Sequence, residues 1–196
     1  MIARLGTALV LTLAAALPLA AEPFHHPYGE WREYHYDWLA VCPDVINEDA
    51  TDFYGTSCFA STSSQELNAA NLPAYQLTLL RNRLTGELDV AVTVAADNVA
   101  VDTSRPLRLS FAGDTPQAYA FGIDLETRYN TTNRYYVADP ARRDTLIEQM
   151  KRRNAVTMIV PLTGGKTASK SVRLSMRGVT ASLDFMSSYA RRVAQY

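Results

Sequence analysis

Apolar and polar residues alternate along much of the middle of the chain. Between residues 87 and 94 apolar side chains occupy every second position, and the same period occurs from 75 to 79. A period of two is typical of a half-buried β-strand, so these runs predict a hairpin that turns at 84–87. Further alternating runs at 107–111 and 119–123 add strands. One-sided alternation of this kind favours an antiparallel sheet.

The segment 34–42 alternates in the same way, which predicts one strand. This strand would place five residues on one face: Tyr34, Tyr36, Trp38, Ala40 and Cys42. Glu33, His35 and Asp37 would share the opposite face. A second candidate strand, 56–62, contains Cys58. A bond between the two cysteines would therefore join two strands across the intervening loop.

The C-terminal part combines helices with a second hairpin. Asp139 followed by Pro140 is an N-cap with proline at the first helical position, and apolar residues in 141–153 recur at helical spacing. Alternating runs at 156–162 and 172–176 predict the hairpin, and 179–193 predicts a closing helix. The expected fold is mainly β: an antiparallel β-sandwich or partly open barrel of about eight strands, with one inserted and one C-terminal helix.

The first 21 residues have the pattern of a cleaved signal peptide. A short start containing Arg4 precedes an apolar run from Leu5 to Leu17, and small residues end at Ala21. No other apolar stretch approaches the roughly 20 residues that a membrane span needs. We expect a protein of the periplasm or cell envelope, with residues 22–196 forming one domain and no stable membrane span after cleavage.

The only two cysteines, Cys42 and Cys58, are predicted to form a disulfide. Export into an oxidising compartment and an even cysteine count both favour this pairing. Closing a loop of this length stabilises a fold by about 3 kcal/mol in the chain-entropy model. The bond would leave no thiol for chemistry.

Charge is distributed unevenly along the mature chain. Residues 22–136 contain 7 basic and 16 acidic side chains, whereas residues 137–196 contain 11 basic and 4 acidic ones. No linker rich in proline, glycine or serine separates the two parts, which favours complementary halves of one fold over an anion-binding domain. The basic residues also lack the interleaved aromatic residues of a nucleic-acid-binding face, so we expect no nucleic-acid partner.

Catalytic motifs are missing from the sequence. No nucleophile elbow, His-Glu-x-x-His zinc motif or glycine-rich phosphate loop occurs, so we expect no enzyme activity and no cofactor. The alternative is an exported enzyme or metal-binding protein that uses the region from His25 to Asp37, where His26, His35 and Glu33 also lie. Tyrosine-rich stretches predict instead a protein-binding surface, formed by Tyr34, His35, Tyr36, Tyr135 and Tyr136.

Several short motifs resemble the invasion-associated locus B family of bacterial exported proteins. The first is the run from Trp38 to Cys42, and the second surrounds Cys58. The C-terminal part adds the helical run 146–151 and the segment from Val172 to Leu183. Many members have a further cysteine pair shortly before the helix, whereas residues 133–138 of this chain contain none.

This resemblance implies a periplasmic or cell-envelope protein with a β-sandwich-like fold. Members are not known as enzymes, so no catalytic residue carries over to this chain. The family name implies a role linked to host-cell invasion. The expected function is therefore binding or structural, with an envelope or host protein as the partner.

Overall fold

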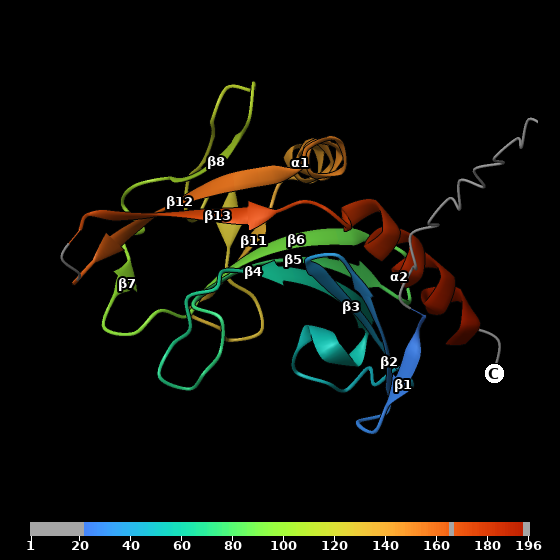
Figure 1. Cartoon of the computed structure of the whole chain (residues 1–196). Helices are drawn as coiled ribbons and strands as arrows, with labels where there is room; N and C mark the ends of the chain where they lie inside the picture. The colour runs from blue at the N-terminus through green and yellow to red at the C-terminus, as the bar shows by residue number, and fades with distance from the viewer. Residues whose placement is uncertain (1–21, 165–166, 194–196) are drawn as a thin grey trace, which may run out of the picture.

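The fold is built around two antiparallel β-sheets and two helices (Figure 1). It is taken from a computed structural model that describes residues 22–164 and 167–193. The predicted signal peptide lies outside these residues. The larger sheet has eight strands, in the spatial order β1-β2-β3-β4-β5-β6-β11-β10. Their bounds are Phe24–His26 (β1), Glu30–His35 (β2), Trp38–Pro43 (β3), Ser57–Ser63 (β4), Tyr75–Asn82 (β5), Leu88–Val94 (β6), Arg134–Val137 (β11) and Leu125–Glu126 (β10).

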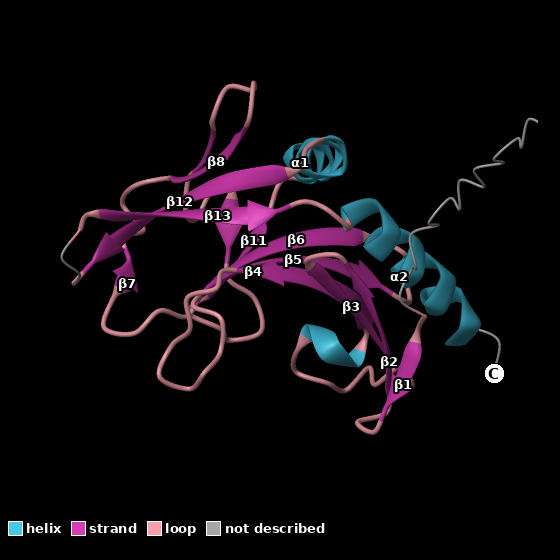
Figure 2. Ribbon diagram, in the orientation of Figure 1, coloured by secondary structure: helices cyan, strands magenta, loops and turns pink. Residues whose placement is uncertain are grey.

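The smaller sheet has five strands and lies over one face of the larger sheet (Figure 2). Four of its strands follow the order β13-β12-β8-β9, and the short β7 pairs with the far end of β12. Their bounds are Ala100–Val101 (β7), Leu107–Phe111 (β8), Gln117–Tyr119 (β9), Ala155–Thr163 (β12) and Ser169–Ser175 (β13). The predicted hairpins at 75–94 and 156–176 are thus confirmed, one in each sheet.

Helix α1, Pro140–Arg152, begins where the sequence predicts. The Asp139 side chain accepts a hydrogen bond from the backbone N–H of Arg142, and Pro140 occupies the first turn. The helix buries Leu146, Ile147 and Met150. These three side chains belong to the main core, and α1 contacts β6 and β11 of the larger sheet.

Helix α2, Val179–Val193, contacts strands β2 to β5 of the larger sheet. Gly178 precedes it with φ +108, and a Cβ atom there would lie 1.9 Å from the backbone oxygen of His35. Only glycine fits this close approach, which fixes where the helix starts. In the described part of the chain, neither helix has the length and apolarity that crossing a membrane requires.

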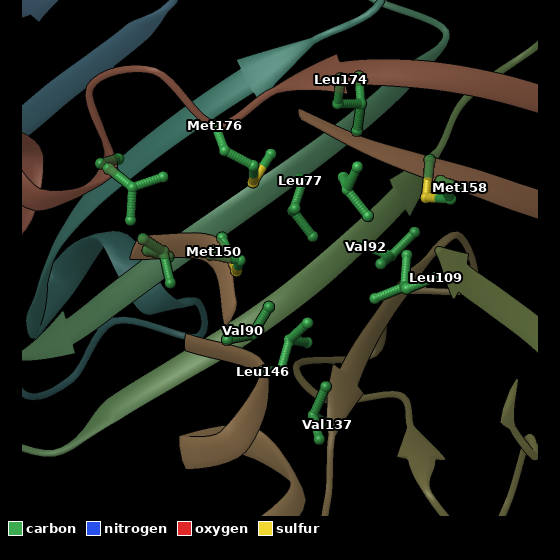
Figure 3. Close-up of a cluster of buried hydrophobic side chains, with 14 of the residues drawn as sticks. Leu77, Val90, Val92, Leu109, Val137, Leu146, Met150, Met158, Leu174 and Met176 are labelled. Carbon is green, nitrogen blue, oxygen red and sulfur yellow. The ribbon is translucent and has the colours of Figure 1, made fainter. Parts of the chain in front are cut away.

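The main core fills the space between the two sheets and the helices (Figure 3). The larger sheet supplies Leu77, Val90 and Val92, and the smaller sheet supplies Leu109 and Met158. These contributions from both sheets confirm the expected mainly β, sandwich-like fold with one inserted and one C-terminal helix. The strands do not close into a barrel.

A second apolar cluster covers part of the opposite face of the larger sheet. It contains Phe53 from the 3₁₀ helix η1 (Phe53–Gly55), together with Leu80, Ala91 and Tyr136. Phe59 packs against this cluster. The middle of the larger sheet is therefore buried on both faces.

The disulfide between Cys42 and Cys58 is confirmed. Continuing the register of β3 and β4 places the two cysteines directly opposite each other, with their Cα atoms 4.3 Å apart. Both residues are buried in the main core. The bond therefore joins neighbouring strands at the centre of the fold.

The prediction of one continuous strand over 34–42 is wrong. Two strands, β2 and β3, occupy this segment, and a turn at Tyr36 and Asp37 joins them. Tyr36 has a positive φ of 55°, so the chain reverses there. Because His35 now pairs with Trp38, these two residues share a face, while Tyr34 lies on the other side.

Candidate binding surface

Exposed aromatic rings lie along the N-terminal edge of the larger sheet, from the turn before β2 to the turn after it. Phe24, Tyr28, Tyr34 and Tyr36 lie on the β1–β2 hairpin and the following turn, and their exposed fractions are 41, 82, 52 and 68%. The Phe24 and Tyr34 rings stack with their centroids 6.4 Å apart. We refer to these four residues as the aromatic surface.

The register of the hairpin explains why these rings are exposed. Alternate residues of β2 point in opposite directions, and Trp31 and His35 point toward α2. The Trp31 ring lies 5.5 Å from Tyr189, and the His35 ring lies 6.2 Å from Phe185. Tyr34 therefore belongs to the face that α2 does not cover.

A charged side chain also lies on the aromatic surface. Arg32 pairs with Glu30, and its guanidinium carbon lies 5.9 Å from the centre of the Tyr28 ring. A cation over an aromatic face limits the motion of both groups and adds a weak attraction. The surface thus combines apolar ring area with hydrogen-bonding hydroxyl groups and a fixed charge.

The structure does not bring all five predicted surface residues together. Tyr34 and Tyr36 are exposed, but the His35 side chain is only 11% exposed, and its Nε2 lies 3.6 Å from Glu33. Tyr135 and Tyr136 are 7 and 1% exposed and lie on β11, across the larger sheet from β2. Burial raises the pKa of both phenols. These two tyrosines belong to the core and offer no surface to a partner.

Two members of the aromatic surface, Phe24 and Tyr28, were absent from the prediction. No hairpin was predicted between residues 24 and 35. The signal was present in the turn His26-Pro27-Tyr28-Gly29, where Gly29 takes a positive φ of 74°.

The three histidines do not form a common ligand set. His25 pairs with Asp44 at 2.6 Å, while His26 lies 4.0 Å from Glu30. His25 and His26 are successive residues of β1 and point to opposite faces of the hairpin. Within residues 22–164 and 167–193, no group of three histidine, cysteine or acidic side chains could hold a metal ion.

The two oppositely charged halves of the chain are complementary, as expected. Ion pairs link basic residues after position 137 to acidic residues before it: Arg142 to Asp124, Arg143 to Asp89, Arg153 to Asp114 and Lys170 to Glu66. Such pairs at the surface each contribute little to stability. Three of them connect α1 or β13 to the larger sheet or its loops, through Asp89, Asp124 and Glu66.

Comparisons with known proteins support the fold. No protein-family model matches the sequence, and no curated protein matches it. Among solved structures, the chain is similar to invasion associated protein B from Bartonella henselae, with a TM-score of 0.54 and 13% sequence identity. The similarity covers 82% of this chain and 98% of that chain. At this identity it shows a shared fold and does not show family membership.

Proposed function

We propose that this chain is an exported, non-enzymatic protein of the periplasm or cell envelope that binds an envelope or host protein. The aromatic surface is the contact site in this proposal. It supports the proposal because large aromatic side chains left exposed together are typical of protein interfaces. Tyrosine in particular offers a large contact area at a low cost in conformational entropy.

Export is part of the proposal. The pattern of residues 1–21 supports it, and so does the bond between Cys42 and Cys58, since such bonds persist in oxidising compartments. We expect the mature protein from the periplasm to begin at Glu22 and to contain this bond within one chain. Intact-protein mass spectrometry with and without reduction measures both. An uncleaved chain with two free thiols would contradict export.

A role linked to host-cell invasion is the finer part of the proposal. The similarity in fold to invasion associated protein B supports it, together with the short motifs shared with the invasion-associated locus B family. We infer membership of that family on the same grounds. Deleting the gene should then reduce entry into host cells without slowing growth in culture, and unchanged entry would contradict this role.

Capture of a partner from the native envelope tests the binding function. Purified mature protein should retain a partner reproducibly at physiological salt, and the double substitution Tyr28→Ser with Tyr34→Ser should abolish this. Both side chains are exposed, so the variant should fold normally.

A matched control for this capture is Ile123→Ser. Ile123 is 77% exposed and lies in the loop before β10, at the opposite edge of the larger sheet from β1. The control should capture the partner as well as the unsubstituted protein does. Equal capture by all three proteins would contradict a role for the aromatic surface.

A further inference from the structure

The outer face of the smaller sheet is built from small polar side chains around arginines. Val156 of β12 and Leu174 of β13 pair with each other and point into the core. Their neighbours Thr157 and Arg173, which form the next pair, therefore point outward. Register places Ser110, Thr157 and Arg173 in one row across β8, β12 and β13. Arg173 is exposed on this face.

Two hollows lie along this face. The first, of about 680 Å³, separates β13 from the end of β4, and Ser64 and Arg177 line it. The second, of about 420 Å³, lies beside the end of α1, and Arg152 lines it. Both hollows include Asn154, Ala155 and Arg173. Because they share these residues, the two hollows adjoin, and we refer to them together as the arginine groove.

The arginines of this groove differ from the other basic residues of the C-terminal part. Within the described residues, Arg173 and Arg177 have no carboxylate within ion-pair distance, and the Arg177 guanidinium lies over the Tyr36 ring at 4.6 Å. Arg152 lies 3.8 Å from Glu148, and its side chain is 76% exposed. The guanidinium groups of Arg173 and Arg177 thus remain available to an anion, whereas Arg152 shares the Glu148 carboxylate with Lys151.

The acidic residues near the groove do not cancel this charge. Asp37 lines the first hollow but lies beyond ion-pair distance from Arg177. Asp114 pairs with Arg153 at the second hollow, so each neutralises the other. The groove therefore keeps an excess of positive charge along its length.

We propose that the arginine groove binds an anionic glycan, a chain that carries sulfate or carboxylate groups on a hydroxyl-rich backbone. Guanidinium groups bind such anions through paired hydrogen bonds. Between the arginines, the Ser110, Thr157 and Asn154 side chains can exchange hydrogen bonds with sugar hydroxyl groups. The two hollows together are too large for a single inorganic anion, which favours an extended ligand.

The lining of the groove favours a glycan over other extended anions. Strand-like peptides are recognised through apolar pockets for alternate side chains, and the groove floor between the arginines consists of Ser110, Ala112, Ala155 and Thr157. Single-stranded nucleic acid needs a row of exposed aromatic rings for stacking, and no aromatic side chain among the described residues lines either hollow. This site meets the aromatic surface only at Tyr36, over which Arg177 lies, and it does not rest on the protein-binding function proposed above.

Binding of heparin by the purified mature protein tests the proposal. Titration calorimetry at physiological salt should show binding, and Arg173→Gln should weaken it by about tenfold, the effect of losing one charge-assisted contact. The double variant with Arg177→Gln should weaken it further. Neutral dextran should not bind, because it lacks the anionic groups.

Lys151→Gln is the matched control. It removes one charge from the residue next to Arg152, but Lys151 lies outside the groove and pairs with Glu148. This variant should bind heparin with an affinity within twofold of that of the unsubstituted protein.

Heparin binding that does not depend on Arg173 would overturn the proposal. Binding of poly-glutamate with equal affinity and the same dependence on Arg173 would also overturn it. Tyr28→Ser with Tyr34→Ser should retain heparin binding, which separates this test from the test of the aromatic surface.

Discussion

The two sheets differ in how many of their faces are buried. The middle of the larger sheet has the main core on one face and the Phe53 cluster on the other. The smaller sheet buries one face and leaves Ser110, Thr157 and Arg173 on the other. Substitutions at the centre of the larger sheet should therefore affect folding, whereas those on the outer face of the smaller sheet should affect only binding.

The largest effect on folding is expected at Trp38. This residue is fully buried, and its indole N–H donates to the backbone oxygen of Ser175 at 2.9 Å, which joins β3 to the end of β13. Trp38→Ala should lower the free energy of unfolding by about 3–5 kcal/mol. Urea denaturation measures this, with Trp31→Ala at the partly exposed edge as the comparison. An equal loss at both positions would contradict the difference between centre and edge.

Removing the disulfide should have the next largest effect. Replacing Cys42 and Cys58 together with alanine should destabilise the protein by about 3 kcal/mol, since the unfolded chain loses a constraint on its loop. Reduction of the unsubstituted protein should give a similar shift in the urea midpoint. A change below about 1 kcal/mol would show that the bond does not stabilise the larger sheet.

The buried face of the smaller sheet should respond to alkaline pH. Burial raises the pKa of Tyr119 to about 12, from an ordinary value of 10.0. Above pH 10 the unfolded chain releases this proton while the folded protein keeps it, so stability falls as the pH rises toward 12. The free energy of unfolding should fall by about 2 kcal/mol between pH 10 and pH 12.

Tyr119→Phe provides the control for this pH dependence. The variant has no phenol at position 119, so its stability should fall less steeply over the same pH range. The variant also loses the 2.7 Å hydrogen bond that the Tyr119 hydroxyl donates to the Gln117 side chain. Its free energy of unfolding should therefore already be lower at neutral pH. Identical slopes for the two proteins in chemical denaturation from pH 9 to 12 would contradict a raised pKa at Tyr119.

The smallest effect on stability is expected on the outer face of the smaller sheet. Arg173→Gln should change the free energy of unfolding by less than about 0.5 kcal/mol, because the side chain is exposed and has no carboxylate partner among the described residues. Thermal unfolding by circular dichroism measures this. A larger destabilisation would mean that Arg173 supports the fold.

The fold was largely predictable because its hairpins and helix starts depend on local pattern. The prediction failed where a turn interrupted the pattern, as at Tyr36, a residue that seldom adopts a positive φ. The alternating pattern also predicted that the strands around 75–79 and 88–94 are buried on one face only. In the structure Thr78 and Ala91 are buried as well, because Phe53 and Tyr136 cover the far face.

The candidate site was less predictable than the fold. Tyrosine-rich stretches indicated an interaction surface, but the sequence alone does not distinguish an exposed ring such as Tyr34 from a buried one such as Tyr136. That difference depends on which strand lies at the edge of the sheet. The arginine groove was missed for a related reason, since only the ion pairs formed in the folded chain separate Arg173 from Arg153.

Site-specific photo-crosslinking in living cells tests the central claim most directly. A photoreactive phenylalanine analogue at Tyr34 places the probe on the aromatic surface, and the same analogue at Ile123 places it at the opposite edge of the larger sheet. We predict one discrete crosslinked protein partner from position 34 and none from position 123. The same product from both positions, or no product from position 34, would contradict binding through the aromatic surface.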